Sequence, residues 1–168
     1  FAMLKASGVA MQPKPFAVGL RIEHPQSLID RARWGEAAGH PRLGPAEYKL
    51  VHHCQEPATA GRSVYSFCMC PGGMVVPAAA YATANIVNGM SRYKRSGRFA
   101  NAACVAGINL SSLMGKTVAP LEALDWLGDL EHRFYQYSKG YKAPFAFIDG
   151  FIKQQAPSRT ADTSYPLG

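Results

Sequence analysis

The most informative part of this chain runs from residue 61 to residue 76 and reads GRSVYSFCMCPGGMVV. Its first half, from Val64 to Met69, alternates side chains at the period of a strand. Pro71, Gly72 and Gly73 then predict a tight turn, because proline presets its φ angle and glycine accepts positive φ. An extended run resumes at Met74, so the segment predicts a hairpin. Its bare turn indicates either a plain bend or a place where a ligand or another domain approaches the backbone closely.

The segments expected around this hairpin are strands before residue 110 and, mostly, helices after it. The sequence pattern predicts strands at residues 16–23, 47–54, 85–88 and 100–109, and helices at 26–34, 121–139 and 144–153, with the end of a further helix near 3–8. This order predicts an α+β fold: a mostly antiparallel sheet or partly open barrel, with helices packed on one side and concentrated in the C-terminal half. Residues 154–168 are rich in Pro, Ser and Thr, which is typical of a linker.

The same periodicities predict which side chains share a face. The inward set is Leu28, Ile29 and Ala32 in the first of these helices, Leu124, Leu127 and Phe134 in the long one, and Phe145, Ile148 and Ile152 in the last. In the strand expected at 47–54, one face carries Tyr48, Leu50 and His52. Gly35 and Gly140 are expected to end the first and the long helix.

Composition indicates one globular domain. The 168 residues are 48% hydrophobic and 17% charged, which supplies enough core material for a single domain. No apolar run approaches the length that spans a bilayer, so we expect no membrane partner. The four cysteines are too few for a disulfide framework, and no export signal is visible. We therefore expect reduced thiols and a cytoplasmic location.

The formal net charge of +7 permits three kinds of partner: nucleic acid, a membrane surface or an anionic small molecule. Most basic residues are scattered along the chain. The exception is a cluster that consists of Arg92, Lys94, Arg95 and Arg98. A solvated loop is the commoner explanation of such a cluster.

The candidates for catalysis are His24, Cys68 and Cys70. No second Cys or His pair at zinc spacing accompanies the two cysteines, so we expect no metal site. A nucleophilic thiol needs a pKa lowered by a neighbouring cation, and a buried, inert thiol is the favoured interpretation. His24 is a candidate general acid or base at a strand end, although a structural, hydrogen-bonded histidine is commoner there. The chain contains no phosphate loop and no Gly-x-Gly-x-x-Gly motif.

Several short segments of this sequence resemble one family of flavoproteins. These are FAVGLRIEHPQ at 16–26, LGPAEYKL at 43–50, the segment from Gly61 to Gly73, VNGMS at 87–91 and ANA at 100–102. In this order they resemble the large bacterial FAD-dependent dehydrogenases, NAD(P)/FAD-dependent oxidoreductases of the glutathione-reductase-like plan. One departure is Ala80-Tyr81, where the family is expected to have Ser-Glu.

The resemblance implies that the chain is a piece of a larger enzyme. Residues 1–153 would be the inserted middle domain, which covers the flavin and forms part of the substrate pocket, and 154–168 would lead back to the missing FAD-binding domain. That domain of the same polypeptide is the expected partner, together with an unknown small-molecule substrate. The full-length protein would hold FAD, with NAD(P)H as a candidate donor. The isolated chain is expected to hold no cofactor, to be inactive and to be capable of self-association.

The resemblance also implies which residues face the flavin domain. They are Cys70, Pro71, Gly72 and Gly73 in the turn, with backbone N–H groups free to donate, and Asn88, Gly89, Met90 and Ser91 in the second stretch. Arg21 and Arg92 are the substrate-binding candidates, and the catalytic residue itself is not identified. The walls of this patch are expected to be apolar, from Phe67, Met69 and Met90.

Two other classes of function remain open from the residues alone. A basic chain with aromatic residues on its strands suits single-stranded nucleic acid, although we do not expect that partner. The aromatic residues concerned are Tyr65, Phe67, Tyr93 and Phe99. The other class is a structural or dimerisation module.

Overall fold

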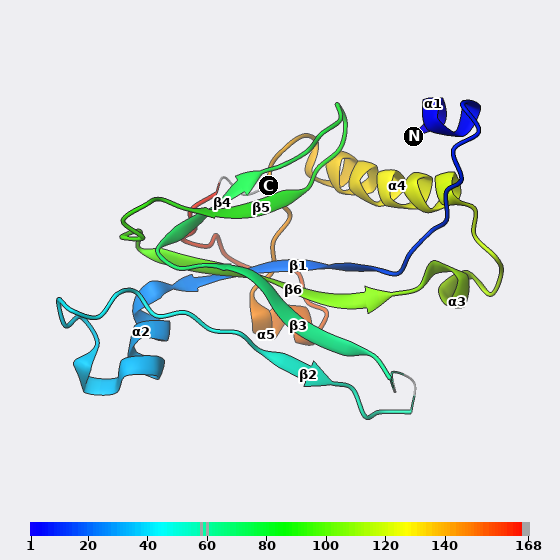
Figure 1. The fold of residues 1–168 in the computed structure, drawn as a ribbon. Helices are drawn as coiled ribbons and strands as arrows, with labels where there is room; N and C mark the ends of the chain where they lie inside the picture. Colours follow the sequence, from blue (N-terminus) through cyan, green and yellow to red (C-terminus); the bar gives the residue numbers. More distant parts are fainter. Residues whose placement is uncertain (58, 60, 166–168) are drawn as a thin grey trace.

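The computed structural model describes residues 1–57, 59 and 61–165, and it has an α+β fold (Figure 1). All strand pairs in it are antiparallel, and they form an open four-stranded sheet and a separate two-stranded sheet. The predicted fold class is therefore confirmed. The helices α3, α4 and α5 follow the last strand, whereas α1 and α2 flank the first.

The four-stranded sheet has the order β1-β6-β3-β2. Its strands are β1 (Phe16–Pro25), β2 (Val51–His53), β3 (Ser63–Cys70) and β6 (Phe99–Ile108). β6 lies between β1 and β3 and pairs with β1 along its whole length, from Phe16 opposite Ile108 to Pro25 opposite Phe99. The strand predicted at 100–109 is confirmed, but its burial only in part: Ala100, Asn101 and Ala102 are buried, since small side chains let neighbours pack closely there, and the later residues are not. The strand expected at 47–54 is formed only over Val51–His53.

The predicted hairpin is wrong in its pairing. Both strands and the turn between them are formed, but β3 pairs with β6, whereas β4 (Gly73–Pro77) pairs with β5 (Val87–Ser91). The reason is a β-bulge between Phe67 and Cys70, where Cys68 has a φ of 49°. A bulge bends and twists its strand. The chain therefore leaves the four-stranded sheet at the turn and starts a second layer, which lies above it in Figure 1.

The helix α2 (Gln26–Trp34) has the predicted bounds and ends at Gly35, which has a φ of 58°. Its predicted inward face is only partly correct, because Leu28 and Ala32 are exposed. A buried polar side chain anchors this helix instead. Gln26 Nε2 donates to the Ala46 carbonyl at 3.0 Å, and its Oε1 accepts from the Gly72 N–H at 2.7 Å.

The long helix α4 (Pro120–Ser138) confirms the prediction for 121–139, but it packs mainly through its first turns. Ala123 joins a core cluster with Leu110 and Val118, and Trp126 lies against Phe16 with ring centroids 6.1 Å apart. Leu124 and Leu127 are half-buried, as expected for inward residues at the edge of a core. Phe134 is exposed, so this part of the predicted stripe is wrong.

Polar contacts hold the C-terminal half of α4. The Asn85 N–H donates to the Glu131 carbonyl at 3.1 Å, and His132 Nδ1 bonds the Thr83 carbonyl at 2.9 Å. The remaining helices are single turns, α1 (Ala2–Ala6), α3 (Leu110–Met114) and α5 (Ile148–Ile152). The helix predicted at 144–153 is too long, and its inward set is wrong at Ile148 and Ile152, which are exposed, whereas Phe145 is half-buried.

The described part of the C-terminal segment has no helix or strand, but it lies against the sheets. The Ser164 N–H donates to Glu23 Oε1 at 2.9 Å, and Ser164 Oγ accepts from the Val75 N–H at 2.9 Å. Asp162 pairs with Arg98 at 2.6 Å. These contacts tie β1 and β4 together. None of the helices in the described residues is long and apolar enough to cross a membrane.

The core cluster generates a stability prediction within one helix. Leu110 is 4% exposed and Leu113, one turn later, is 55% exposed. We expect Leu110→Ala to lower the free energy of unfolding by roughly 2–5 kcal/mol, because it leaves a cavity. The matched variant Leu113→Ala should change it by no more than about 0.5 kcal/mol. Denaturant unfolding of both variants measures this, and equal losses would mean that α3 packs in another register.

Candidate functional site

Two candidate residues that are close in sequence lie on opposite faces of the four-stranded sheet. Successive side chains of a strand point to opposite faces, so Arg21 and His24 of β1 separate. Arg21 contacts Asn88 of β5, in the second sheet. His24 contacts Tyr48, in the segment that leads to β2. The structure therefore divides the predicted site into two places.

The first place, which we call the Arg21 cluster, consists of Arg21, Asn88, Asn101 and the Cys68 carbonyl. Arg21 Nη1 donates to Asn101 Oδ1 at 2.7 Å, and Nη2 donates to Asn88 Oδ1 at 3.2 Å. Both nitrogens also lie within hydrogen-bond distance of the Cys68 carbonyl, at 3.4 and 3.3 Å. Within the described residues the guanidinium forms no ion pair with a carboxylate. All the hydrogen-bond acceptors that the described residues offer to this charged guanidinium are therefore neutral.

Gly89 is needed for this arrangement. A Cβ atom at this position would lie 2.3 Å from Arg21 Nη1 and 2.1 Å from Asn101 Oδ1. Any larger side chain would push the guanidinium out of the cluster. Gly89, in the Asn-Gly-Met-Ser segment, thus leaves space for the Arg21 side chain rather than for a ligand.

The Pro71–Gly73 turn is buried by the chain itself. The Gly72 N–H donates to Gln26 Oε1 at 2.7 Å, and its carbonyl accepts from the Gly97 N–H at 3.0 Å. The close approach predicted at this turn is real, but the loop at residues 95–97 makes it. The expectation that the turn has free N–H groups is wrong at Gly72, because Gln26 occupies that donor.

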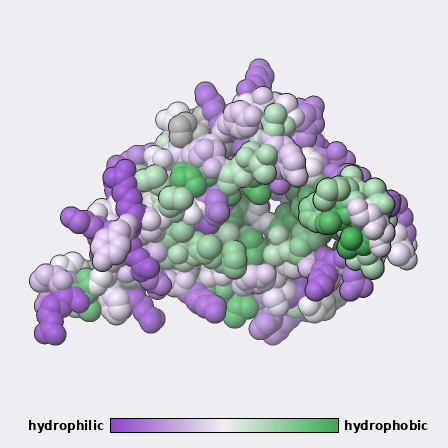
Figure 2. Space-filling view, turned by 45° about the horizontal axis from the view of Figure 1, so that its top comes forward, coloured by the Kyte–Doolittle hydropathy of each residue, from purple (hydrophilic) through white to green (hydrophobic). Residues whose placement is uncertain are grey.

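The two predicted stretches do lie together. Gly73 pairs with Ser91 in the β4–β5 ladder, and Ser91 Oγ donates to the Pro71 carbonyl at 2.8 Å. Beside them, Phe67 and Met90 are 59% and 60% exposed, and Cys68 is exposed as well. Met69 is half-buried. More broadly, Figure 2 shows apolar side chains in the middle of one face of the molecule, with hydrophilic side chains mainly around them.

Among the described contacts, none joins Arg92 to the Arg21 cluster. Arg92 lies in an exposed loop, next to Tyr93, whose side chain is fully exposed. In the same loop Arg95 pairs with Glu47 at 2.5 Å and Arg98 pairs with Asp162. The solvated loop predicted for this basic run is observed, and its two later arginines are attached to the domain.

The two cysteine candidates differ in their environments. Burial raises the pKa of the Cys70 thiol, whose Sγ donates to the Cys68 carbonyl at 3.3 Å. A thiol of this kind is protonated near neutral pH and is a poor nucleophile. Cys68 is exposed at the bulge. A catalytic role for either residue stays a prediction. Among the described residues, no three His, Cys, Asp or Glu side chains lie close enough together to hold a metal ion.

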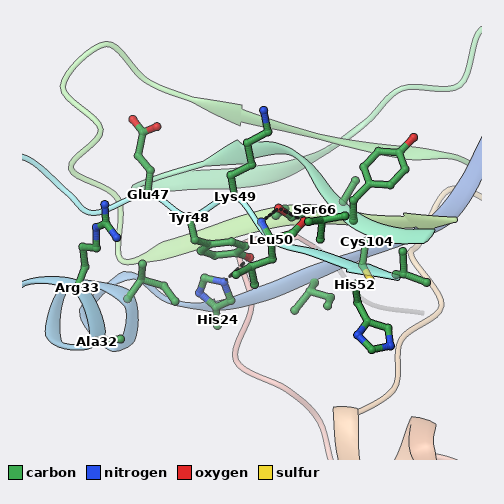
Figure 3. A pocket seen from close by; sticks show the side chains of 17 residues that line it. His24, Ala32, Arg33, Glu47, Tyr48, Lys49, Leu50, His52, Ser66 and Cys104 are labelled. Atoms are coloured by element: carbon green, nitrogen blue, oxygen red, sulfur yellow. Dashed lines mark hydrogen bonds between the residues drawn. The ribbon is translucent and has the colours of Figure 1, made fainter. Parts of the chain in front are cut away.

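The second place is a groove of about 780 Å³ on the His24 face of the sheet (Figure 3). It lies between α2, the sheet and the segment at residues 47–52. His24 Nε2 lies 3.0 Å from the Tyr48 hydroxyl, and Figure 3 shows the two rings together in the groove. Burial lowers the pKa of His24 and raises the pKa of Tyr48, so both side chains are neutral near neutral pH.

Sequence reasoning selected His24 but missed Tyr48 and the groove. The alternation of Tyr48, Leu50 and His52 was a usable signal, since it correctly indicated an extended segment with one shared face. Figure 3 shows Tyr48 and Leu50 on the His24 side, whereas Glu47 and Lys49 extend away from it. Nothing local in the sequence indicates that this face meets His24.

The position of Gly72 generates a second prediction. Its φ is 52°, and a Cβ atom there would lie 1.9 Å from the Arg95 carbonyl oxygen. We expect Gly72→Ala to cost more than about 1 kcal/mol of unfolding free energy, since backbone atoms have to move. The matched control is Gly107→Ala, where no atom lies within 4 Å of the added Cβ. Unfolding by urea compares the two, and a tolerated Gly72→Ala would contradict the buried turn.

The burial of His24 generates a prediction about pH. Its pKa is lowered in the folded state from the ordinary value of 6.5, so the unfolded chain binds the proton more readily. Its contribution is complete above about pH 6.5 and is lost as the pH falls below it. We expect the melting temperature of the wild type to fall more steeply than that of His24→Gln between about pH 6.5 and pH 5. His53→Gln, at an exposed position of β2, is the control; parallel curves for wild type and His24→Gln would contradict the prediction.

Comparison with known proteins identifies the family. This α+β domain, which has no dinucleotide-binding motif, matches over residues 15–168 the model described as FAD-dependent protein, C-terminal domain-like. The chain belongs to this family. It is also 36% identical over 171 residues to an uncharacterized protein of Clostridium beijerinckii. The match includes 100% of this chain but only 31% of that protein, so the chain spans about a third of the relative's length.

Proposed function

We propose that this chain is the inserted middle domain of an FAD-dependent oxidoreductase of the dehydrogenase class, in which it covers the flavin and forms part of the substrate pocket. The observation that carries the proposal is membership of a family of FAD-dependent proteins. The share of the relative's length that lies outside the match leaves room for an FAD-binding domain in the same polypeptide. That domain is the proposed partner, since the Gly-rich motif for the FAD pyrophosphate is absent from this chain.

The exposed part of the Arg21 cluster fits contact with a flavin edge. Arg21 is half-buried and Asn88 is exposed, whereas Asn101 lies fully buried beneath them, with its Nδ2 unpaired among the described residues. The charge of Arg21, which no carboxylate pairs in the described residues, suits a neighbour rich in acceptor atoms. When bound, FAD supplies hydride transfer, with NAD(P)H as the proposed donor.

The roles of the chain's own residues follow from their exposure. Phe67 and Met90 would pack against the FAD-binding domain and exclude water, because large exposed apolar side chains beside a polar cluster are typical of an interface. Arg21 would hold its charge at a fixed position, and Arg92 in the neighbouring loop would be free to contact an anionic substrate. Alone, the chain would be inactive and hold no FAD.

Two further parts of the proposal rest on the cysteines and the basic loop. Cys54, Cys68, Cys70 and Cys104 are all free thiols, which suits a reducing, cytoplasmic compartment. The alternative function in nucleic-acid binding is less well supported, since Arg95 and Arg98 of the basic loop are engaged by carboxylates.

The proposal predicts how well the flavin is shielded in the full-length polypeptide. Met90→Glu places a charge in the proposed contact, so quenching of flavin fluorescence by iodide should increase, and the flavin absorption spectrum should shift. Leu113→Glu is the matched control, since Leu113 is 55% exposed, similar to Met90, but lies on α3. Quenching that responds equally to both variants, or to neither, would contradict a flavin-covering role for this face.

A further inference from the structure

The groove on the His24 face is separate from the surface that the proposed function uses. Its floor is formed by β1, β3 and β6, and its sides by α2 and the 47–52 segment. The Arg21 cluster lies on the opposite face of the same sheet. The groove therefore needs an explanation of its own.

Small side chains of β6 create the groove. Ala102 is 2% exposed and lies at its floor beside Cys104, opposite Ile22 of β1. Ile29 of α2 and Leu50 complete the apolar walls. A volume of about 780 Å³ is within the usual range for sites that hold small organic molecules.

The uncharged polar groups of the groove are few. The His24–Tyr48 pair is the main one, and burial keeps the imidazole uncharged. Ser66 Oγ is engaged, because the Leu50 N–H donates to it at 2.8 Å. An apolar site with one such pair is typical of pockets that orient a ligand through one or two hydrogen bonds.

The charged residues of the groove favour an anion. Arg33 and Lys49 belong to its lining, and neither forms an ion pair with a carboxylate in the described residues. The lining carboxylate, Glu47, is paired with Arg95 at 2.5 Å. Figure 3 shows Arg33 at the α2 end of the groove, on the side where Tyr48 lies, whereas Lys49 extends away.

We propose that this groove binds a small organic acid, with its apolar body over the half-buried Ile22 and Cys104 and its carboxylate toward Arg33. An amine would meet uncompensated positive charge at the mouth. A neutral molecule of the same shape would lose the contribution of Arg33. This inference does not depend on the proposed flavin-covering role, because none of these residues lies in the Arg21 cluster.

The test uses three probes with one apolar body and different end groups: octanoate, octanol and octylamine. Calorimetry on the chain should rank octanoate first, octanol weaker and octylamine weakest. Arg33→Ala should weaken octanoate roughly two- to five-fold, the range for an exposed ion pair, and leave octanol unchanged. Lys94→Ala removes the same charge from the basic loop, outside the groove lining, and should change neither.

Occupancy of the groove itself is tested by filling it. Leu50→Trp, at a wall position that is 62% exposed, adds bulk without altering a buried residue and should abolish binding of octanoate. The melting temperature of each variant shows whether it is folded. The proposal is overturned if no probe binds at millimolar concentration, if Arg33→Ala and Lys94→Ala have equal effects, or if folded Leu50→Trp binds octanoate like the wild type. None of these measurements involves flavin, so they are independent of the iodide experiment.

Discussion

The hydrogen bonds of the Arg21 guanidinium hold the two sheets of this domain in their relative positions. The side chain starts on β1, reaches Asn101 on β6 and Asn88 on β5, and meets the Cys68 carbonyl at the bulge of β3. Arg21 is half-buried, and partial burial of a charged group is costly unless its donors are satisfied. The positions of these acceptors, and the absence of a Cβ atom at Gly89, are consequences of that constraint.

The bulge also explains why local patterns predicted the elements better than their partners. Alternation and helical periodicity placed β1, β6, α2 and α4 correctly, because these signals reflect backbone geometry within one segment. The pairing of β3 depends instead on a single residue, Cys68, with positive φ. That conformation is rare outside glycine, so no rule based on residue type predicts it, and the expected hairpin was wrong.

Burial was predicted less well than secondary structure for a related reason. Leu28, Phe134 and Ile148 fit the apolar stripes of their helices, yet they are exposed, since a stripe is buried only where another element covers it. At the candidate site, the turn signals and the family resemblance together correctly predicted that the Pro-Gly-Gly and Asn-Gly stretches lie side by side. The contact of His24 with Tyr48 was not predicted, because it joins segments that are 24 residues apart and follows from the path of a loop.

The alternation of β1 finally determines how the two candidate sites relate. Arg21 and Glu23 point to the layered side, where one holds the β5 layer and the other binds Ser164 of the C-terminal segment. Ile22 and His24 point to the groove. Opposite them, β6 has Asn101 on the layered side and Ala102 at the groove floor. A ligand in the groove and a domain over the Arg21 cluster would thus be separated only by the backbone of one sheet. Any shift of β1 along β6 would change both sites together, since a slip of one residue exchanges the two faces.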